Sequence, residues 1–251
     1  VGVGQNGLVQ GFLGRTDSPD ADEGEYAMSV STRYDSEAGR LIAGYQENDE
    51  DFNPEVGFLR RTDFQRNFAS GRFSPRPGGI DSVRKLTWEG SFDYVTNGAG
   101  RVETRIATGA FGAELENSDR FDVFVTNTHD LLLRSFAIAS DVTIPVGAYD
   151  FSNGSLSYQF GPQRRLSGSV RVEHGSFYGG TKSAIAIGGG FGPGGGGRIE
   201  VSPQFAVEPG LSINRIELPQ GSFTTQLVTT RATYTFSPAV FVSALIQIQL
   251  E

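Results

Sequence analysis

The sequence predicts an all-β protein, an antiparallel up-and-down transmembrane β-barrel of about 14 strands. Apolar and polar residues alternate along segment after segment, which is the period of a strand with two different faces. No helical period of about 3.6 residues interrupts the series. Several segments run for about 10–15 residues, whereas soluble strands average about 5–6 and a bilayer-spanning strand needs about 9–11.

The segment 223–250 has the clearest alternation and predicts a long hairpin. Val228 and Tyr234 share one face of its first strand, Thr229 lies on the other, and Ser237-Pro238 form the turn. The remaining strands follow from the same period. The expected strands cover residues 7–16, 25–34, 40–48, 64–73, 82–96, 101–115, 119–128, 141–149, 151–161, 166–177, 181–187, 198–207, 211–218, 223–236 and 240–250. Residues 130–139 fit either a short helix or a strand, and Pro209-Gly210 predicts a turn.

One face of several strands carries charges of both signs. In a soluble sandwich this face would meet solvent, and in a barrel it would line the lumen, where opposite charges on neighbouring strands can pair. The expected role is an electrostatic lining that biases which solutes pass. The predicted lumen-lining residues are Lys85, Glu89, Asp93, Arg101, Glu103, Arg105, Arg171, Glu173, Arg198 and Glu200.

The more apolar face carries aromatic residues near the strand ends. Outer-membrane barrels place such rings at the level of the lipid headgroups, in two girdles that flank the apolar band. The predicted lipid-facing girdle consists of Tyr26, Tyr45, Trp88, Tyr94, Phe160, Tyr234 and Phe236. A soluble β-sheet protein with one wet face stays open as the alternative.

Composition narrows the class of protein. The formal net charge of −8 argues against a nucleic-acid partner, because that affinity depends on Lys and Arg meeting phosphates. The absence of cysteine excludes disulfides and a thiolate nucleophile. No apolar run reaches the roughly 18 residues of a transmembrane helix. The opening residues are not a targeting segment, so we expect a processed chain or a piece of a longer one.

The sequence predicts no enzyme and no cofactor. His129 and His174 could act as general bases, but no nucleophile motif of the Gly-X-Ser-X-Gly kind accompanies them. Acidic stretches at 17–23 and 49–51 offer oxygen ligands for Ca²⁺ but lack EF-hand spacing. The glycine-rich stretch 188–197 lacks the Lys-Ser/Thr of a phosphate-binding loop. Residues 51–61 are expected to form a structured loop packed on or in the barrel, and the alternative is that Arg60 and Arg61 contact lipopolysaccharide phosphates.

The run Asp51-Phe52-Asn53-Pro54-Glu55-Val56-Gly57-Phe58 carries a resemblance to a known family. It is similar to a signature of bacterial carbohydrate-binding family 9 domain-containing proteins, in which a sugar-binding-like module precedes an outer-membrane β-barrel of unknown function. Further matches follow in the family's order. They are residues 144–149 (Ile-Pro-Val-Gly-Ala-Tyr), 175–180 (Gly-Ser-Phe-Tyr-Gly-Gly), 218–223 (Leu-Pro-Gln-Gly-Ser-Phe) and 234–238 (Tyr-Thr-Phe-Ser-Pro).

The resemblance implies a single domain over residues 1–251 in the bacterial outer membrane, either a complete barrel or an excised section of a larger one. The N-terminal module has no counterpart here, so sugar binding passes to no residue. We expect a pore or the membrane part of a solute-uptake system, with membrane lipid, lipopolysaccharide and small solutes or glycans as partners. The alternative is a plugged barrel or soluble β-sheet module that displays loops to a glycan or partner. The strand 240–250 either pairs with 7–16 to close the barrel or stays an open edge.

Overall fold

The computed structural model describes residues 2–17, 26–53, 61–188 and 197–250. Most of the family signature at 51–61, the acidic stretch 17–23 and the glycine-rich stretch 188–197 lie outside these residues. The described strands are β1 (Gly2–Val3), β2 (Gly7–Arg15), β3 (Tyr26–Asp35), β4 (Gly39–Asn48), β5 (Phe64–Phe73), β6 (Val83–Thr96), β7 (Val102–Leu115), β8 (Arg120–Leu132), β9 (Phe136–Ala139), β10 (Val142–Ile144), β11 (Gly147–Phe160), β12 (Leu166–Phe177), β13 (Gly180–Gly188), β14 (Arg198–Ser202), β15 (Phe205–Leu218), β16 (Gly221–Ser237) and β17 (Val240–Leu250).

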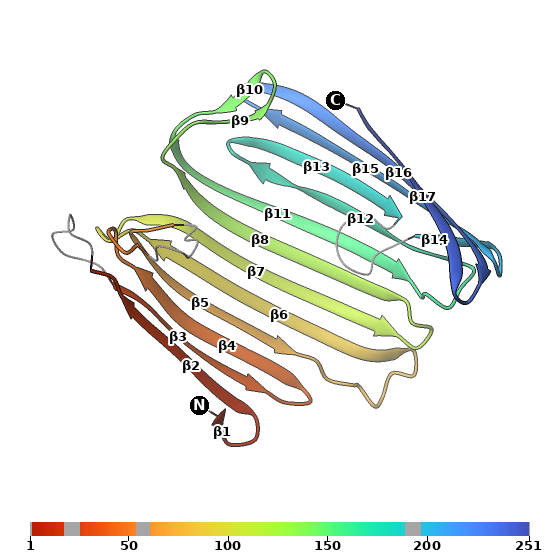
Figure 1. The fold of residues 1–251 in the computed structure, drawn as a ribbon, viewed down its shortest axis with the longest axis horizontal. Coiled ribbons are helices and arrows are strands. Elements are labelled where there is room, and N and C mark those ends of the chain that lie inside the picture. Colours follow the sequence, from red (N-terminus) through yellow and green to blue (C-terminus); the bar gives the residue numbers. More distant parts are fainter. Residues whose placement is uncertain (1, 18–25, 54–60, 189–196, 251) are drawn as a thin grey trace.

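The strands form one 15-stranded sheet and a separate β9–β10 hairpin. The sheet is an up-and-down meander, in which each strand pairs antiparallel with its neighbours, from β1 and β2 at one edge to β17 at the other (Figure 1). The predicted all-β, up-and-down architecture of about 14 strands is therefore confirmed. Among the described strands, β17 pairs only with β16, and β1 only with β2.

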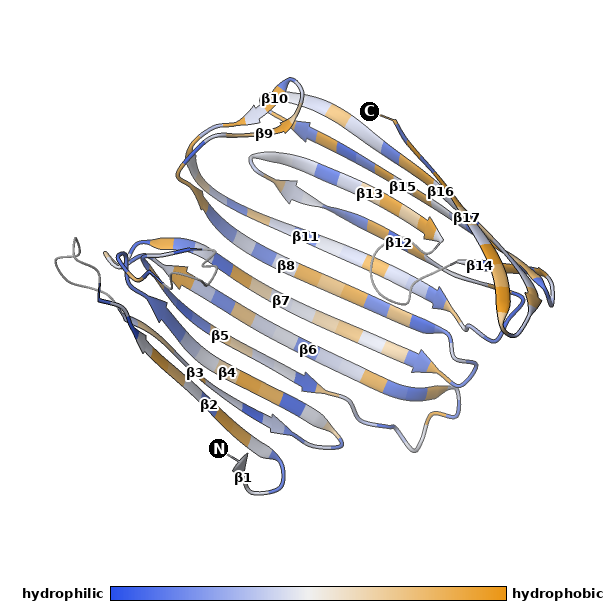
Figure 2. Ribbon diagram, viewed as in Figure 1, coloured by the Kyte–Doolittle hydropathy of each residue, from blue (hydrophilic) through white to orange (hydrophobic). Residues whose placement is uncertain are grey.

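The two faces of the sheet differ in polarity. Cross-strand register puts Trp88 directly between Phe73 and Phe111, and we name this side the apolar face. The neighbouring residue Glu89 lies on the other side, between Arg72 and Ala110, and we name this side the polar face. Figure 2 shows the resulting alternation of hydrophilic and hydrophobic residues along the ribbons. A period of two places successive side chains on opposite faces, as predicted from the sequence.

The two rims of the sheet also differ. The rim at which β8 ends and β11 begins carries the β9–β10 hairpin, and we name it the hairpin rim. The connection 133–146 belongs to this rim, and the other rim, which we name the opposite rim, carries turns such as 36–38 and 238–239. Both β2 and β17 run from the opposite rim to the hairpin rim, because every step across the meander reverses direction.

The one compact apolar core among the described residues lies under the β9–β10 hairpin. Ile144 is fully buried there and packs with Val142, Ile216 and Leu218. Ile216 and Leu218 belong to the polar face of β15, so the hairpin folds over that face at the hairpin rim. The hydroxyl of Tyr149 donates a hydrogen bond to the Pro145 carbonyl at 2.9 Å and holds the end of the hairpin in place.

Three element predictions were wrong. The expected strands 141–149 and 151–161 are not separate, because β10 ends at Ile144 and β11 runs unbroken from Gly147 to Phe160. Pro209-Gly210 is not a turn, because β15 runs unbroken through it. Instead, the expected strand 198–207 breaks after Ser202, whose hydroxyl accepts hydrogen bonds from the backbone N–H groups of Gln204 at 3.3 Å and Phe205 at 3.1 Å. A serine side chain that binds the backbone in this way stabilises a turn.

The reason lies in an interrupted strand next to β15. The position between β12 and β15 is filled by β13 toward the hairpin rim and by β14 toward the opposite rim. The ends of these two pieces nearly touch, since a Cβ on Gly197 would lie 2.8 Å from the Gly188 Cα, and Gly188 has a φ of +90°. Pro209 lies beside this gap, where a residue without an N–H disturbs no ladder.

Candidate functional site

The polar face is the candidate functional site, because it gathers most of the charged side chains of the sheet. Four of them form a row across the strands β3 to β6, in the order Asp35, Arg40, Arg72 and Glu89, each directly opposite the next. The charges in this row do not alternate in sign, because its two central members, Arg40 and Arg72, are both positive. Like charges directly opposite each other destabilise a sheet. This row is therefore a candidate for a functional role rather than a stabilising one.

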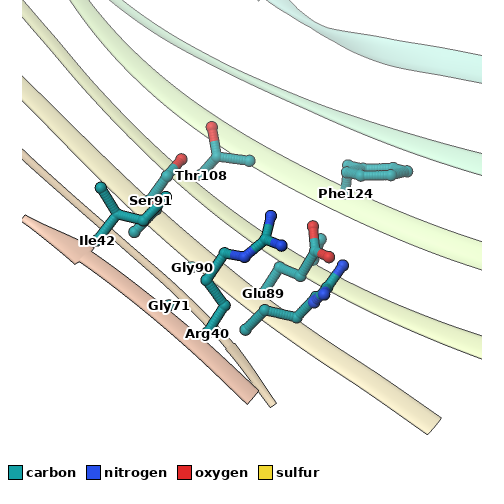
Figure 3. Close-up of a pocket in the computed structure, with 11 residues that line it drawn as sticks. Arg40, Ile42, Gly71, Glu89, Gly90, Ser91, Thr108 and Phe124 are labelled. Carbon is teal, nitrogen blue, oxygen red and sulfur yellow. The ribbon is translucent and has the colours of Figure 1, made fainter. Parts of the chain in front are cut away.

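A groove of about 240 Å³ opens at this row (Figure 3). Arg40, Arg72 and Glu89 supply its charges, and Ser70, Ser91 and Thr108 are among its neutral walls. Figure 3 shows the Arg40 and Glu89 side chains on the same side of the sheet. The groove therefore combines guanidinium and hydroxyl donors, the groups that bind oxygen-bearing solutes.

Ion pairs organise the rest of the polar face. Arg66 binds Asp93 from the neighbouring strand through Nε, at 3.0 and 2.9 Å from the two carboxylate oxygens. Lys182 Nζ lies 2.8 Å from Glu173 Oε1, beside a second hollow of about 260 Å³. Such pairs hold long side chains in place between strands, as expected for a lining with both signs of charge.

The register divides the ten predicted lumen residues. Seven lie on the polar face, and they are Lys85, Glu89, Asp93, Arg171, Glu173, Arg198 and Glu200. Arg101 precedes β7 in a turn, where its backbone N–H donates to Asn97 Oδ1 at 2.9 Å. The expectation that Glu103 and Arg105 share the face of Asp93 was wrong, because Asp93 pairs with Ile106, which places Arg105 on the apolar face.

Charges on the apolar face gather near the hairpin rim. Arg105 Nη2 lies 3.3 Å from Asp150 Oδ1, and His129 Nδ1 lies 3.0 Å from the same oxygen. Glu103 is buried and pairs with Arg61 of the connection between β4 and β5. The apolar face of β7, β8 and β11 therefore becomes polar toward this rim, and the apolar band covers only part of these strands.

The seven predicted girdle residues all lie on the apolar face, in two rows. Trp88, Phe160, Tyr234 and Phe236 lie toward the opposite rim, and Tyr26, Tyr45 and Tyr94 lie toward the hairpin rim. The first row is reinforced by ring contacts, with Trp88 at 5.9 Å from Phe73 and 5.5 Å from Phe111 between ring centroids. Whether these rings face lipid remains a prediction.

A buried carboxylate ties two turns of the opposite rim together. Asp119 is 2% exposed and accepts hydrogen bonds from the Tyr158 hydroxyl at 2.7 Å, the Gly161 N–H at 2.7 Å and Arg164 Nη2 at 2.8 Å. These donors, the Tyr158 hydroxyl above all, hold the pKa of Asp119 below its usual range. The arrangement is a structural clasp between the β7–β8 and β11–β12 turns.

Sequence reasoning missed both this clasp and the Arg40–Arg72 pair. Each needs the register of several strands, which no single segment contains. One signal was available. Arg40 begins the predicted strand 40–48 and Arg72 is the second-last residue of the predicted strand 64–73, and these two ends meet if the strands pair as an antiparallel hairpin.

No metal-binding cluster forms among the residues that the structure describes. Groups of three or more His, Asp or Glu able to hold a metal ion are absent from this part of the chain. The two histidines lie apart, and His174 Nδ1 lies 2.9 Å from the Ser183 hydroxyl rather than from a second titratable group. In the same residues, no helix is long and apolar enough to cross a membrane.

Fold and site together define a class: an all-β protein with one large up-and-down antiparallel sheet, one face charged and one face apolar. No family model, curated protein or solved structure matches the chain.

Proposed function

We propose that this sheet is part of the wall of a bacterial outer-membrane β-barrel, and that its polar face lines an aqueous passage for small polar solutes. The single observation that carries the proposal is the uncovered apolar face. Large side chains such as Trp88, Phe92 and Val125 are 42%, 43% and 58% exposed on it. A soluble monomer rarely exposes apolar patches beyond a few hundred Å².

The dimensions of the apolar band support a bilayer. On β6 the apolar face carries Leu86, Trp88, Gly90, Phe92 and Tyr94 without a charge. From Leu86 to Tyr94 the band covers nine residues, within the roughly 9–11 residues that a tilted strand needs to cross a bilayer. Its two ends coincide with the two aromatic rows, which fit the headgroup levels of membrane lipid and lipopolysaccharide.

A soluble sandwich is the weaker reading. It would require a second sheet packed about 10 Å away on the apolar face. The β9–β10 hairpin, the one additional layer among the described strands, packs on the polar face instead. The resemblance to the outer-membrane family points in the same direction as this argument.

Conductance across planar lipid bilayers tests the passage. We expect detergent-folded protein to migrate differently on a gel before and after boiling, and to produce discrete conductance steps in a bilayer. Protein that stays monodisperse without detergent would exclude the membrane wall. Correctly folded, heat-modifiable protein without conductance would exclude the open pore and leave the wall in place.

The β9–β10 hairpin favours a second candidate, a plugged or narrowed barrel. Its core residues Val142 and Ile144 fix it over the polar face of β15, and Tyr178 donates a hydrogen bond to Asp130 at 2.7 Å beside it. Burial, followed by this hydrogen bond, raises the pKa of the Tyr178 hydroxyl, so it stays protonated across the neutral range. A pore whose conductance rises when residues 134–146 are replaced by a short glycine-serine linker would support this candidate.

A further inference from the structure

We propose that the groove at Arg40, Arg72 and Glu89 binds a small anionic solute that carries a carboxylate or a phosphate. The inference rests on the proposed function, because it takes the polar face to be in contact with water and solutes. It adds the charge class of the solute and the residues that select it.

Opposed like charges are the first observation. Arg40 and Arg72 face each other directly across β4 and β5, which places their Cβ atoms about 4.5–5.5 Å apart. Asp35 neutralises only one side of the pair, since Arg40 Nε donates to Asp35 Oδ1 at 2.5 Å. Asp35 also accepts a hydrogen bond from Arg33, so its charge is shared between two guanidinium groups.

The second observation is that Arg72 keeps its donors free. Within the described residues its side chain forms no hydrogen bond and no ion pair within 4.0 Å, although Glu89 is its direct neighbour on β6. A guanidinium group carries five N–H donors in a planar fork that matches the two oxygens of a carboxylate or phosphate. An arginine that lines a groove with all five unused is suited to receive such a group.

Local charge is the third observation. The groove and its flank combine Arg33, Arg40 and Arg72 with Asp35 and Glu89, an excess of one positive charge. The whole chain has a net charge of −8, so this site is a locally positive region in a negatively charged protein. A bound anion would cancel the excess and relieve the repulsion between the two facing arginines.

Size and position define the ligand further. A groove of about 240 Å³ has room for roughly eight waters at ~30 Å³ each, enough for a phosphate or a small di- or tricarboxylate. The hydroxyls of Ser70, Ser91 and Thr108 can bind its remaining oxygens. The groove opens on the face opposite Trp88 and the apolar band, so lipid headgroups do not reach it from the bilayer side.

Calorimetric titration of inorganic phosphate into the detergent-folded full chain tests the site. We expect saturable binding by the wild type and a loss of about tenfold or more in affinity for Arg72→Gln, the worth of one charge-assisted hydrogen bond or more. Glu89→Gln, which removes the competing carboxylate, is expected to bind more tightly. Arg231→Gln removes an equal charge from the polar face of β16, far across the sheet, and is expected to change affinity less than twofold.

The outcomes separate this inference from the pore. Phosphate binding that depends on Arg72, in a protein without conductance, would keep the anion site and refute the passage. No phosphate binding by the wild type, or equal binding by the wild type and Arg72→Gln, would overturn the anion site even if the protein conducts. A short-chain anionic phospholipid should bind wild type and Arg72→Gln alike; a preference for the wild type would assign the site to lipid instead.

Discussion

Replacing Val125 by arginine asks whether the apolar face is covered by lipid. Val125 lies on the apolar face of β8 and is 58% exposed. Its row continues through Gly109 and Gly90 on one side and Gly154 on the other, halfway along the apolar band of β6. A Cβ on Gly109 would meet no atom within 4 Å, so a longer side chain at Val125 has space beside it. The cost of the substitution is therefore one of solvation rather than of steric overlap.

The two environments give different magnitudes. In water, an exposed surface substitution changes stability by about 0.5 kcal/mol or less. At the midplane of a bilayer, arginine on the lipid face of a barrel costs about 2–4 kcal/mol. A cost of about 2–4 kcal/mol lowers the folding equilibrium constant by roughly 30- to 900-fold. Urea unfolding of the protein from lipid vesicles, followed by the fluorescence of Trp88, the single tryptophan, measures it.

Ile106→Arg is the matched control. Ile106 is 36% exposed on the polar face of β7, directly opposite Asp93, so a new guanidinium meets solvent and a carboxylate there. We expect this variant to unfold within about 0.5 kcal/mol of the wild type. If Val125→Arg were as stable in vesicles as Ile106→Arg, the apolar face would be wet and the membrane wall would be refuted.

Three further predictions follow from the rims, the hairpin and the edges. Asp119→Asn should lower the urea midpoint of unfolding at pH 7, and the difference in midpoint from the wild type should shrink as pH falls below about 4. The reason is that the pKa of Asp119 is lower in the folded than in the unfolded state. Such a carboxylate stabilises the fold above its unfolded-state pKa, and this stabilisation is lost as the carboxylate is protonated. A gap that is the same at pH 7 and pH 3 would contradict this. Ile144→Ala removes the one fully buried side chain of the hairpin core, at a cost of about 2–5 kcal/mol; amides of β9 and β10 should then exchange with deuterium much faster than those of β7, and unchanged exchange would refute the docking argument. In this cysteine-free chain, the double variant Val228→Cys, Ile248→Cys should form a disulfide, because these residues face each other on β16 and β17. Val9→Cys combined in turn with Val242→Cys, Ile246→Cys or Leu250→Cys should form no disulfide. A disulfide in any of these three variants would show that β2 and β17 pair directly and close the sheet.

Alternation along single strands could be predicted from sequence because it is local. Each side chain's face within its own strand follows from a period of two. The seven girdle aromatics were assigned to the more apolar face of each strand, and these apolar faces lie on one side of the folded sheet. Pro209-Gly210 shows where this reasoning fails. The pair has the composition of a turn, yet it lies inside β15 because the neighbouring strand is interrupted, and that neighbour is not visible in the local sequence.

The sequence could not predict which faces of different strands lie on the same side of the sheet, because this depends on the register between the strands. Glu103 and Arg105 have the correct spacing for one face of β7, but the pairing of Asp93 with Ile106 assigns them to the other side from Asp93. A shift of one residue between two strands exchanges the faces completely, and the β6–β7 ladder has an irregularity between Val95 and Thr96. The groove at Arg40 and Arg72 was missed for the same reason, since residues of the five strands β4 to β8 line it.

Strand direction limits what the edge of β17 can pair with. Every ladder of the sheet is antiparallel, and bacterial single-chain barrels keep this rule with an even number of strands. β2 and β17 run in the same direction, so direct pairing between them would give a parallel seam. A second copy paired through its own β17 would be antiparallel but inverted, with its hairpin rim level with the opposite rim of the first copy.

The strand that fits this edge therefore runs from the hairpin rim to the opposite rim, as β1 does beside β2. It would place apolar side chains beside Val242 and Ile246, which are 59% and 63% exposed on the apolar face. β17 has no charged residue or proline from Val240 to Leu250, so it lacks the features that protect a natural edge strand from pairing. Its composition is that of an interior strand, which agrees with a continuous membrane wall and disagrees with a soluble sheet that ends in water.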